Sequence, residues 1–185
     1  MLQPLLEFYK TIEANKYRFT DKGLNETFFI DVYRSQPYEP EAYEYFSLPA
    51  IFVDYSMTGQ GKGNPRVVTM TLHILTDEMP DTSNISNSKK EGLNKFLYNL
   101  LLQQILEGTR LGNTTPLKFI SENAVEDAVT NYHTQTYEFE AYLNSMIEDI
   151  EPVFAAFESL NIYGSLRNRK ILKDIFDPSF DITFQ

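Results

Sequence analysis

The chain has 185 residues and a mass of 21.5 kDa, which is the size of one domain with a hydrophobic core. Its formal net charge of −10 argues against a general nucleic-acid-binding protein and against adsorption to an anionic membrane, since both need a basic surface. The absence of cysteine excludes disulfide bonds, thiolate metal ligands and thiol nucleophiles. Without a secretory leader or a run of about 20 apolar residues, we expect a soluble protein made in the cytoplasm.

The first half of the chain predicts a helix, a strand and a long β-hairpin. Apolar residues at helical spacing predict an amphipathic helix over residues 1–13. Residues 26–34 are rich in aromatic and β-branched side chains and predict a strand. Two further strands are predicted at residues 48–57 and 66–76, and the turn-forming residues 58–65 between them predict a hairpin connection. The second strand of this hairpin alternates cleanly, with one apolar face: Val68, Met70, Leu72 and Ile74.

The second half predicts one long helix and two closing strands. Ser88 and Glu91 match a capping box at the start of the helix. The predicted apolar stripe that would cover the sheet consists of Leu93, Phe96, Leu97, Leu100, Leu101 and Ile105. Residues 117–121 and 131–143 predict the two strands, the second with Tyr137, Phe139, Ala141 and Leu143 on its buried face. Residues 1–144 therefore predict an α+β domain, an antiparallel or mixed β-sheet with helices packed on one face.

Residues 145–185 predict a C-terminal extension of different character. A helix is predicted at residues 146–160, and residues 179–185 (SFDITFQ) predict a short strand. Basic residues gather between them: Arg167, Arg169, Lys170 and Lys173. The apolar residues of the terminal strand alternate: Phe180, Ile182 and Phe184. We expect this extension to dock on another chain, its basic cluster on an acidic surface and its strand on a sheet edge. The alternative is that it packs on its own domain.

The glycine-rich connection superficially resembles a phosphate-binding loop, and its residues are Gly59, Gly61, Lys62, Gly63 and Asn64. A P-loop requires Ser or Thr after its lysine and a helix after the loop. Here Gly63 follows Lys62, and a strand follows the loop. We therefore interpret the segment as a hairpin tip, which can project to contact a neighbouring subunit.

Aromatic residues gather in residues 35–46, which predict a loop. Its tyrosines, Tyr38, Tyr43 and Tyr45, alternate with glutamates that repel phosphate, so stacking on nucleic-acid bases is disfavoured. Tyrosine is enriched at protein interfaces, and the loop predicts either such an interface or a cover for the core.

No catalytic or metal-binding pattern is recognisable in the sequence. His73 and His133 lie in predicted strands without a second ligand at metal-binding spacing. Glu138 and Glu140 share one face of a strand, where carboxylates are ordinarily solvated. We expect no catalytic residues, no metal and no cofactor.

The order of these elements, with LPAIFV at residues 48–53 and LHILTD at residues 72–77, resembles the tail terminator and tail-completion proteins of tailed bacteriophages. The resemblance covers residues 1–143. It implies a non-enzymatic structural virion protein that forms a ring at the head–tail junction, hexameric or, as in connector rings, dodecameric. Genomic DNA would pass through the lumen of this ring without specific binding. The neighbours of the ring would be connector, portal or tail proteins. The resemblance also implies a place in the tail or neck of the virion, after synthesis in the cytoplasm of the bacterial host.

In such a ring we expect subunit contacts at the hairpin tip, the aromatic loop and the C-terminal extension. Two alternatives stay open. The chain could be a non-catalytic phage assembly or binding protein, such as a chaperone, that acts as a monomer or dimer. It could also be an enzyme whose site has no recognisable motif.

Overall fold

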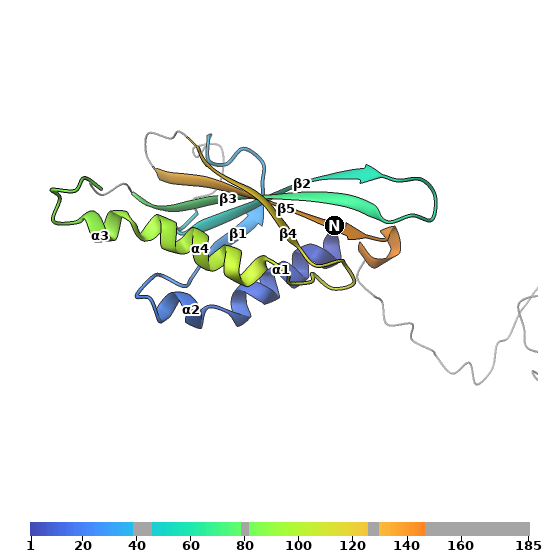
Figure 1. Ribbon diagram of the computed structural model, residues 1–185, viewed down its shortest axis with the longest axis horizontal. Helices are drawn as coiled ribbons and strands as arrows, with labels where there is room; N and C mark the ends of the chain where they lie inside the picture. Colours follow the sequence, from blue (N-terminus) through green and yellow to red (C-terminus); the bar gives the residue numbers. More distant parts are fainter. Residues whose placement is uncertain (39–45, 79–81, 126–129, 147–185) are drawn as a thin grey trace, which may run out of the picture. The chain divides into compact units, whose positions relative to one another are not determined.

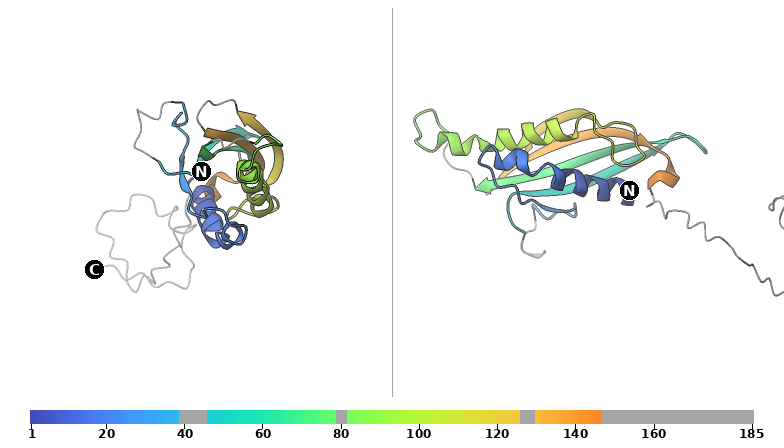
Figure 2. Two further views of the ribbon diagram at one scale, coloured as in Figure 1. Left: turned by 90° about the vertical axis from the view of Figure 1, so that its left-hand side faces the viewer. Right: turned by 90° about the horizontal axis from the view of Figure 1, so that it is seen from below.

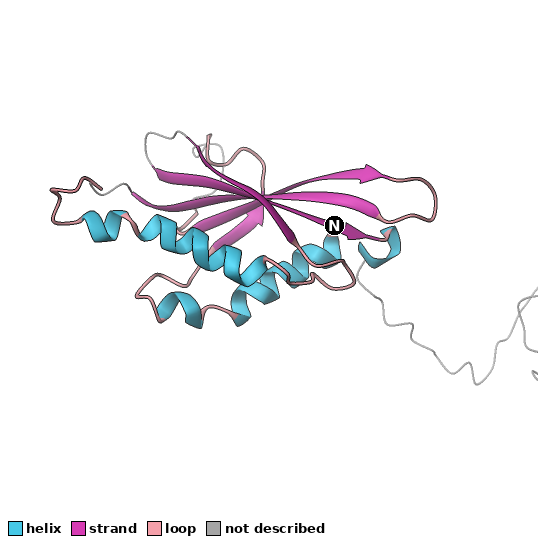
Figure 3. Cartoon of the chain, in the orientation of Figure 1, coloured by secondary structure: helices cyan, strands magenta, loops and turns pink. Residues whose placement is uncertain are grey.

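A computed structural model describes residues 1–38, 46–78, 82–125 and 130–146 of the chain. These residues form a five-stranded β-sheet with helices on one face, as Figure 1 and Figure 3 show. The helices are α1 (Leu2–Ala14), α2 (Tyr17–Thr20), α3 (Lys89–Gly92), α4 (Asn94–Leu106) and the 3₁₀ helix η2 (Leu143–Met146). The strands are β1 (Phe29–Val32), β2 (Ala50–Gly59), β3 (Arg66–Glu78), β4 (Lys118–Val125) and β5 (Thr130–Ala141).

The sheet is mixed, with the strand order β1-β2-β3-β5-β4. β1 pairs with β2 in parallel, and every other neighbouring pair of strands is antiparallel. The predicted α+β fold with a long hairpin and helices on one face is confirmed. Of the predicted extension, residues 147–185 lie outside the described residues.

The hairpin of β2 and β3 is longer than the strand beside it. β2 has 10 residues, and its register with β3 runs from Ala50 opposite Leu75 to Gly59 opposite Arg66. β1 pairs with β2 only as far as Val53, where the Tyr33 N–H donates a 3.0 Å hydrogen bond to the Val53 carbonyl. Among the described residues, no strand pairs with the outer side of β2 beyond Val53. The hairpin end also extends past the helices, as Figure 1 and the right-hand view of Figure 2 show.

One face of the sheet packs against α1, α2 and α4, and we call it the helix-covered face. The alternating residues predicted for β3 are all buried there: Val68, Met70, Leu72 and Ile74. From the helices, Phe8, Phe19 and Leu102 are fully buried against them. Burying such a side chain stabilises the fold by about 1.5–3 kcal/mol. This cluster is the main core of the domain.

The opposite face carries a second, smaller apolar cluster at the end of the sheet away from the hairpin tip. Its buried members are Ala50, Phe52, Leu75 and Tyr132. Partly buried residues from β1 and from the chain after it pack on this cluster, among them Phe29, Tyr33 and Phe46. At the hairpin end the opposite face has no such cover among the described residues.

The predicted stripe of α4 is partly wrong. Its buried residues are Tyr98, Asn99, Leu101, Leu102, Ile105 and Leu106. Leu93, Phe96 and Leu100 are instead 46%, 47% and 54% exposed. The helix is apolar around most of its circumference, and Tyr98 and Leu102 occupy the core in place of the predicted residues because they face the sheet. The exposed residues form a stripe of their own, which we call the outer α4 stripe.

Two smaller predictions in this half of the chain are also wrong. The capping box does not form, because the Ser88 side chain makes no cap hydrogen bond and its hydroxyl lies 3.0 Å from that of Ser86. The short helix α3 ends at Gly92, and α4 begins separately at Asn94. β5 ends at Ala141, so Leu143 lies in η2 and is 56% exposed.

The two faces of α4 predict opposite sensitivities to truncation. Leu102→Ala should lower the free energy of unfolding by about 2–5 kcal/mol, because it leaves a cavity in the core. Leu100→Ala should change it by about 0.5 kcal/mol or less, because the side chain is half exposed. Urea unfolding followed by circular dichroism measures both. Equal losses for the two variants would contradict the orientation of α4.

Candidate functional site

The hairpin tip depends on backbone conformations that glycine adopts readily, as the sequence predicts. Gly61 and Gly63 have φ of +98° and +85°, a region that side chains other than glycine rarely adopt. The Asn64 amide donates a 2.7 Å hydrogen bond to the Gln60 carbonyl across the turn, and Lys62 is exposed beside it. Gly59 belongs to β2, where the Arg66 guanidinium lies in the space that a Cβ would fill. The interpretation as a projecting hairpin tip is confirmed.

The side of β2 next to this tip carries exposed apolar residues. Tyr55 and Met57 are 43% and 44% exposed, and they point to the same face of the sheet as Val53, the helix-covered face. Across the hairpin they lie opposite Met70 and Val68, which are buried. Sequence reasoning did not single out these two residues, although their alternation with polar neighbours in DYSMTG is a recognisable signal.

The backbone of residues 54–59 forms the open edge of the sheet. Along a strand, the N–H and C=O groups of successive residues point to alternate sides. Since the Val53 carbonyl points toward β1, the backbone groups of Tyr55, Met57 and Gly59 point outward beyond the end of β1. The Asp54 carboxylate accepts a 2.7 Å hydrogen bond from the Tyr55 N–H. An edge of this kind can pair with a further strand.

The aromatic residues predicted as an interface are only partly described. Tyr38 is 60% exposed, and its ring meets that of Tyr132 edge to face with centroids 5.9 Å apart. Tyr33 stacks on His73 with centroids 3.9 Å apart, and His73 Nδ1 is hydrogen-bonded to the Tyr132 hydroxyl. These rings cover the smaller apolar cluster. The other predicted interface residues outside the tip lie outside the described residues: Tyr43, Tyr45, Arg167, Arg169, Lys170, Phe180 and Ile182.

A polar network joins α4 to β4 and β5, with Asn99 and Gln135 buried and the Glu122 side chain 29% exposed, and sequence reasoning missed it. The fully buried Gln135 amide donates to the Asn99 carbonyl at 2.8 Å and to Glu122 Oε2 at 2.9 Å. The Asn99 amide donates to Glu122 Oε1 at 3.1 Å. The Tyr137 hydroxyl donates to Gln135 Oε1 at 2.9 Å. Apart from Asn99 Oδ1, which has no hydrogen-bond partner among the described residues, the polar groups of this network satisfy one another.

His133 lies beside this network in its neutral form. Burial lowers the pKa of His133 below its ordinary value of 6.5, an effect that Glu122 opposes and Lys95 reinforces. His133 Nδ1 lies 3.7 Å from Glu122 Oε1, too far for a hydrogen bond, and it has no partner among the described residues. The pair is therefore not an ion pair at neutral pH. Among the described residues, no group of three or more acidic or histidine side chains is placed to hold a metal ion.

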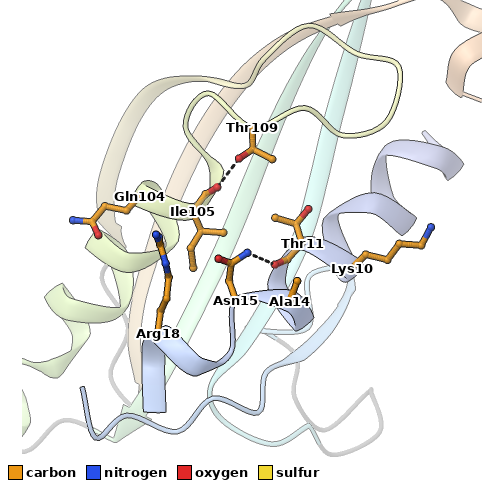
Figure 4. A pocket seen from close by; sticks show the side chains of 8 residues that line it. All are labelled: Lys10, Thr11, Ala14, Asn15, Arg18, Gln104, Ile105 and Thr109. Atoms are coloured by element: carbon orange, nitrogen blue, oxygen red, sulfur yellow. Dashed lines mark hydrogen bonds between the residues drawn. The ribbon is translucent and has the colours of Figure 1, made fainter. Parts of the chain in front are cut away.

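A shallow hollow of about 470 Å³ lies between α1 and α4 (Figure 4). Its lining residues are Lys10, Thr11, Ala14, Asn15, Arg18, Gln104, Ile105 and Thr109. Two of its polar side chains bond to carbonyls of their own helical segment, Asn15 to Thr11 at 2.8 Å and Thr109 to Ile105 at 2.7 Å. The hydrogen bonds of these side chains therefore fix the ends of the helices.

The two histidines predict a loss of stability in mild acid. Burial lowers the pKa of His73 as well as that of His133, against a smaller opposing effect of Asp54 on His73. As the pH falls below about 6.5, the unfolded chain binds protons before the folded chain does, so the free energy of unfolding decreases. His133→Gln should reduce this decrease between pH 7.5 and 5.5, as measured by urea unfolding. A decrease as large as in the unsubstituted chain would contradict a buried neutral His133.

Two comparisons with known proteins complete the description. No protein-family model matches the chain, and no curated protein sequence matches it. In the described part of the chain, none of the helices is both long and apolar enough to cross a membrane.

Proposed function

We propose that the chain is a structural subunit that assembles into a ring at the head–tail junction of a tailed bacteriophage, as a tail terminator or another connector or collar ring. The observation that carries this proposal is the hairpin of β2 and β3. It extends beyond the helices and offers both a backbone edge with which no strand pairs among the described residues and the exposed side chains of Tyr55 and Met57. Surfaces that combine these features favour association with another polypeptide.

A second apolar surface supports assembly through two different contacts. The outer α4 stripe exposes Leu93, Phe96 and Leu100 on the side of the helix turned away from the core. It is separate from the open edge, which lies on β2. Contact between two different surfaces of identical subunits is heterologous, and such contacts close into a ring when the rotation between subunits allows it.

Charge and element order agree with a ring through which DNA passes. A chain of net charge −10 repels the phosphate backbone, so an acidic lumen would let DNA slide without binding. The order of helix, strand, hairpin, helix and two closing strands, on which the resemblance to tail terminator proteins rests, is the order of α1, β1, β2–β3, α4 and β4–β5. In this function the chain needs no cofactor or metal.

The oligomeric mass tests this proposal. Mass photometry of the purified chain should give about six or twelve times the 21.5 kDa of the monomer, and negative-stain images should show rings. A monomer or dimer would contradict the ring and favour the alternative, a phage assembly or binding protein.

The contribution of the hairpin is tested by a double substitution. Tyr55→Ser with Met57→Ser should leave the far-ultraviolet circular dichroism unchanged, because both side chains are exposed, and should convert rings to monomers. Tyr17→Ser is the matched control, since Tyr17 is 58% exposed on α2 and should not affect assembly. Intact rings from the double variant would remove the hairpin from the interface.

A further inference from the structure

The open edge of β2 can accept a partner strand, and the chain itself contains a segment suited to it. We propose that residues 179–185 of one subunit add as a strand to the open edge, residues 54–59, of the adjacent copy. This inference rests on the ring assembly proposed above and names the contact that holds neighbouring subunits together.

The acceptor is defined by its backbone. Tyr55, Met57 and Gly59 direct their N–H and C=O groups outward where β1 has ended. The Asp54 carboxylate occupies the Tyr55 N–H, and rotation of this exposed side chain would free the group for a new strand. Main-chain hydrogen bonds of this kind supply affinity when a strand is added to a sheet edge, and alternate side chains supply specificity.

The donor segment has the matching alternation. Phe180, Ile182 and Phe184 fall on one side of an extended chain, and the intervening residues are polar. Added to the open edge, the three apolar side chains would lie beside Tyr55 and Met57 on the helix-covered face. The polar residues would then lie beside Ser56 and Thr58, which are exposed on the opposite face. The segment is also about as long as the open edge.

Charge favours the same placement. At the hairpin end, the opposite face of the sheet carries three carboxylates, Asp54, Glu138 and Glu140, which Lys118 partly offsets. The basic residues that precede the donor segment are opposite in sign: Arg167, Arg169, Lys170 and Lys173. Complementary potentials of this kind guide a binding segment to its site and set its orientation.

The donor and the acceptor are different parts of one chain, which makes their contact heterologous and suited to a closed ring. Residues 147–178 connect the described domain to the donor, and a fully extended chain of that length spans on the order of 100 Å. This reach allows docking on the neighbour, but also on the same chain, so the experiment must separate the two.

The absence of native cysteine makes disulfide trapping clean. Chains with Ser56→Cys or Thr58→Cys are co-expressed with chains carrying Thr183→Cys, purified as rings and oxidised mildly. Non-reducing electrophoresis should show a disulfide-linked dimer that contains one chain of each kind, in at least ten times the yield of the control. The control pairs Thr183→Cys with Asn123→Cys, which is exposed on β4 at the other edge of the sheet.

A chain with both Ser56→Cys and Thr183→Cys separates docking on the neighbour from docking on the same chain. Docking on the neighbour predicts a ladder of linked chains up to the ring number, whereas docking on the same chain gives only an internally linked monomer and overturns the inference. Intact rings without cross-linking at either β2 position, or with equal cross-linking to the β4 control, overturn it as well while the proposed ring stands. A monomeric mass of the unsubstituted chain overturns both proposals.

A pair of tail variants provides a second measurement. Phe180→Ser with Ile182→Ser should lower the fraction of chains in rings at least tenfold at a fixed low concentration. Asp181→Ser with Thr183→Ser, on the other side of the same segment, should leave that fraction unchanged. Equal effects of the two variants, or none, would overturn the assignment of the apolar side of the tail to the open edge.

Discussion

The alternation of side chains along β3 is the constraint on which the other elements of the domain depend. β3 pairs with β2 on one side and with β5 on the other, so its 13 residues connect the two halves of the sheet. Every second side chain from Val68 to Ile74 is buried beneath the helices, while the intervening residues, from Thr69 to His73, face away from them. A shift of one residue in either register would exchange the two faces and place hydroxyl groups and an imidazole in the core.

Helices and strands of equal residue number differ in length, and this difference shapes the surface. β3 and α4 both have 13 residues, but a strand rises about 3.3 Å and a helix 1.5 Å per residue. β3 is therefore about 43 Å long, and α4 is about 20 Å long. A helix of this length that packs along such a strand leaves more than half of the strand's length uncovered. The exposed end of the hairpin, with Tyr55 and Met57, follows from this mismatch and from the short β1.

Local patterns in the sequence predicted the elements of this fold, but not the contacts that depend on tertiary structure. The alternation of β3 and the buried face of β5 up to Ala141 were predicted correctly, because period-two alternation reports the two faces of a sheet directly. The stripe of α4 was partly wrong, since a helix apolar on most sides has no unique buried face. The open edge was not predicted, because it depends on where β1 stops pairing, at Val53.

The polar network between α4 and the sheet was missed for a similar reason. Asn99, Glu122 and Gln135 are far apart in the sequence, and none stands in a recognisable motif. Asn99 and Gln135 fall at buried positions of their own elements, but a polar side chain at such a position does not reveal which partner it will meet. Only the antiparallel register of β4 and β5, which places Glu122 opposite Gln135, brings them together beneath α4.

This network has a consequence for the uniqueness of the folded state. Apolar packing alone would accept α4 in more than one rotational setting, including one with Phe96 and Leu100 turned inward. Such a rotation would separate Asn99 from Glu122 and Gln135, and the buried Asn99 and Gln135 amides left without partners would each cost about 1–3 kcal/mol. The hydrogen bonds among the two amides and the carboxylate can form in only one orientation of α4, so they select that orientation. They keep its alternative apolar side, the outer α4 stripe, available at the surface.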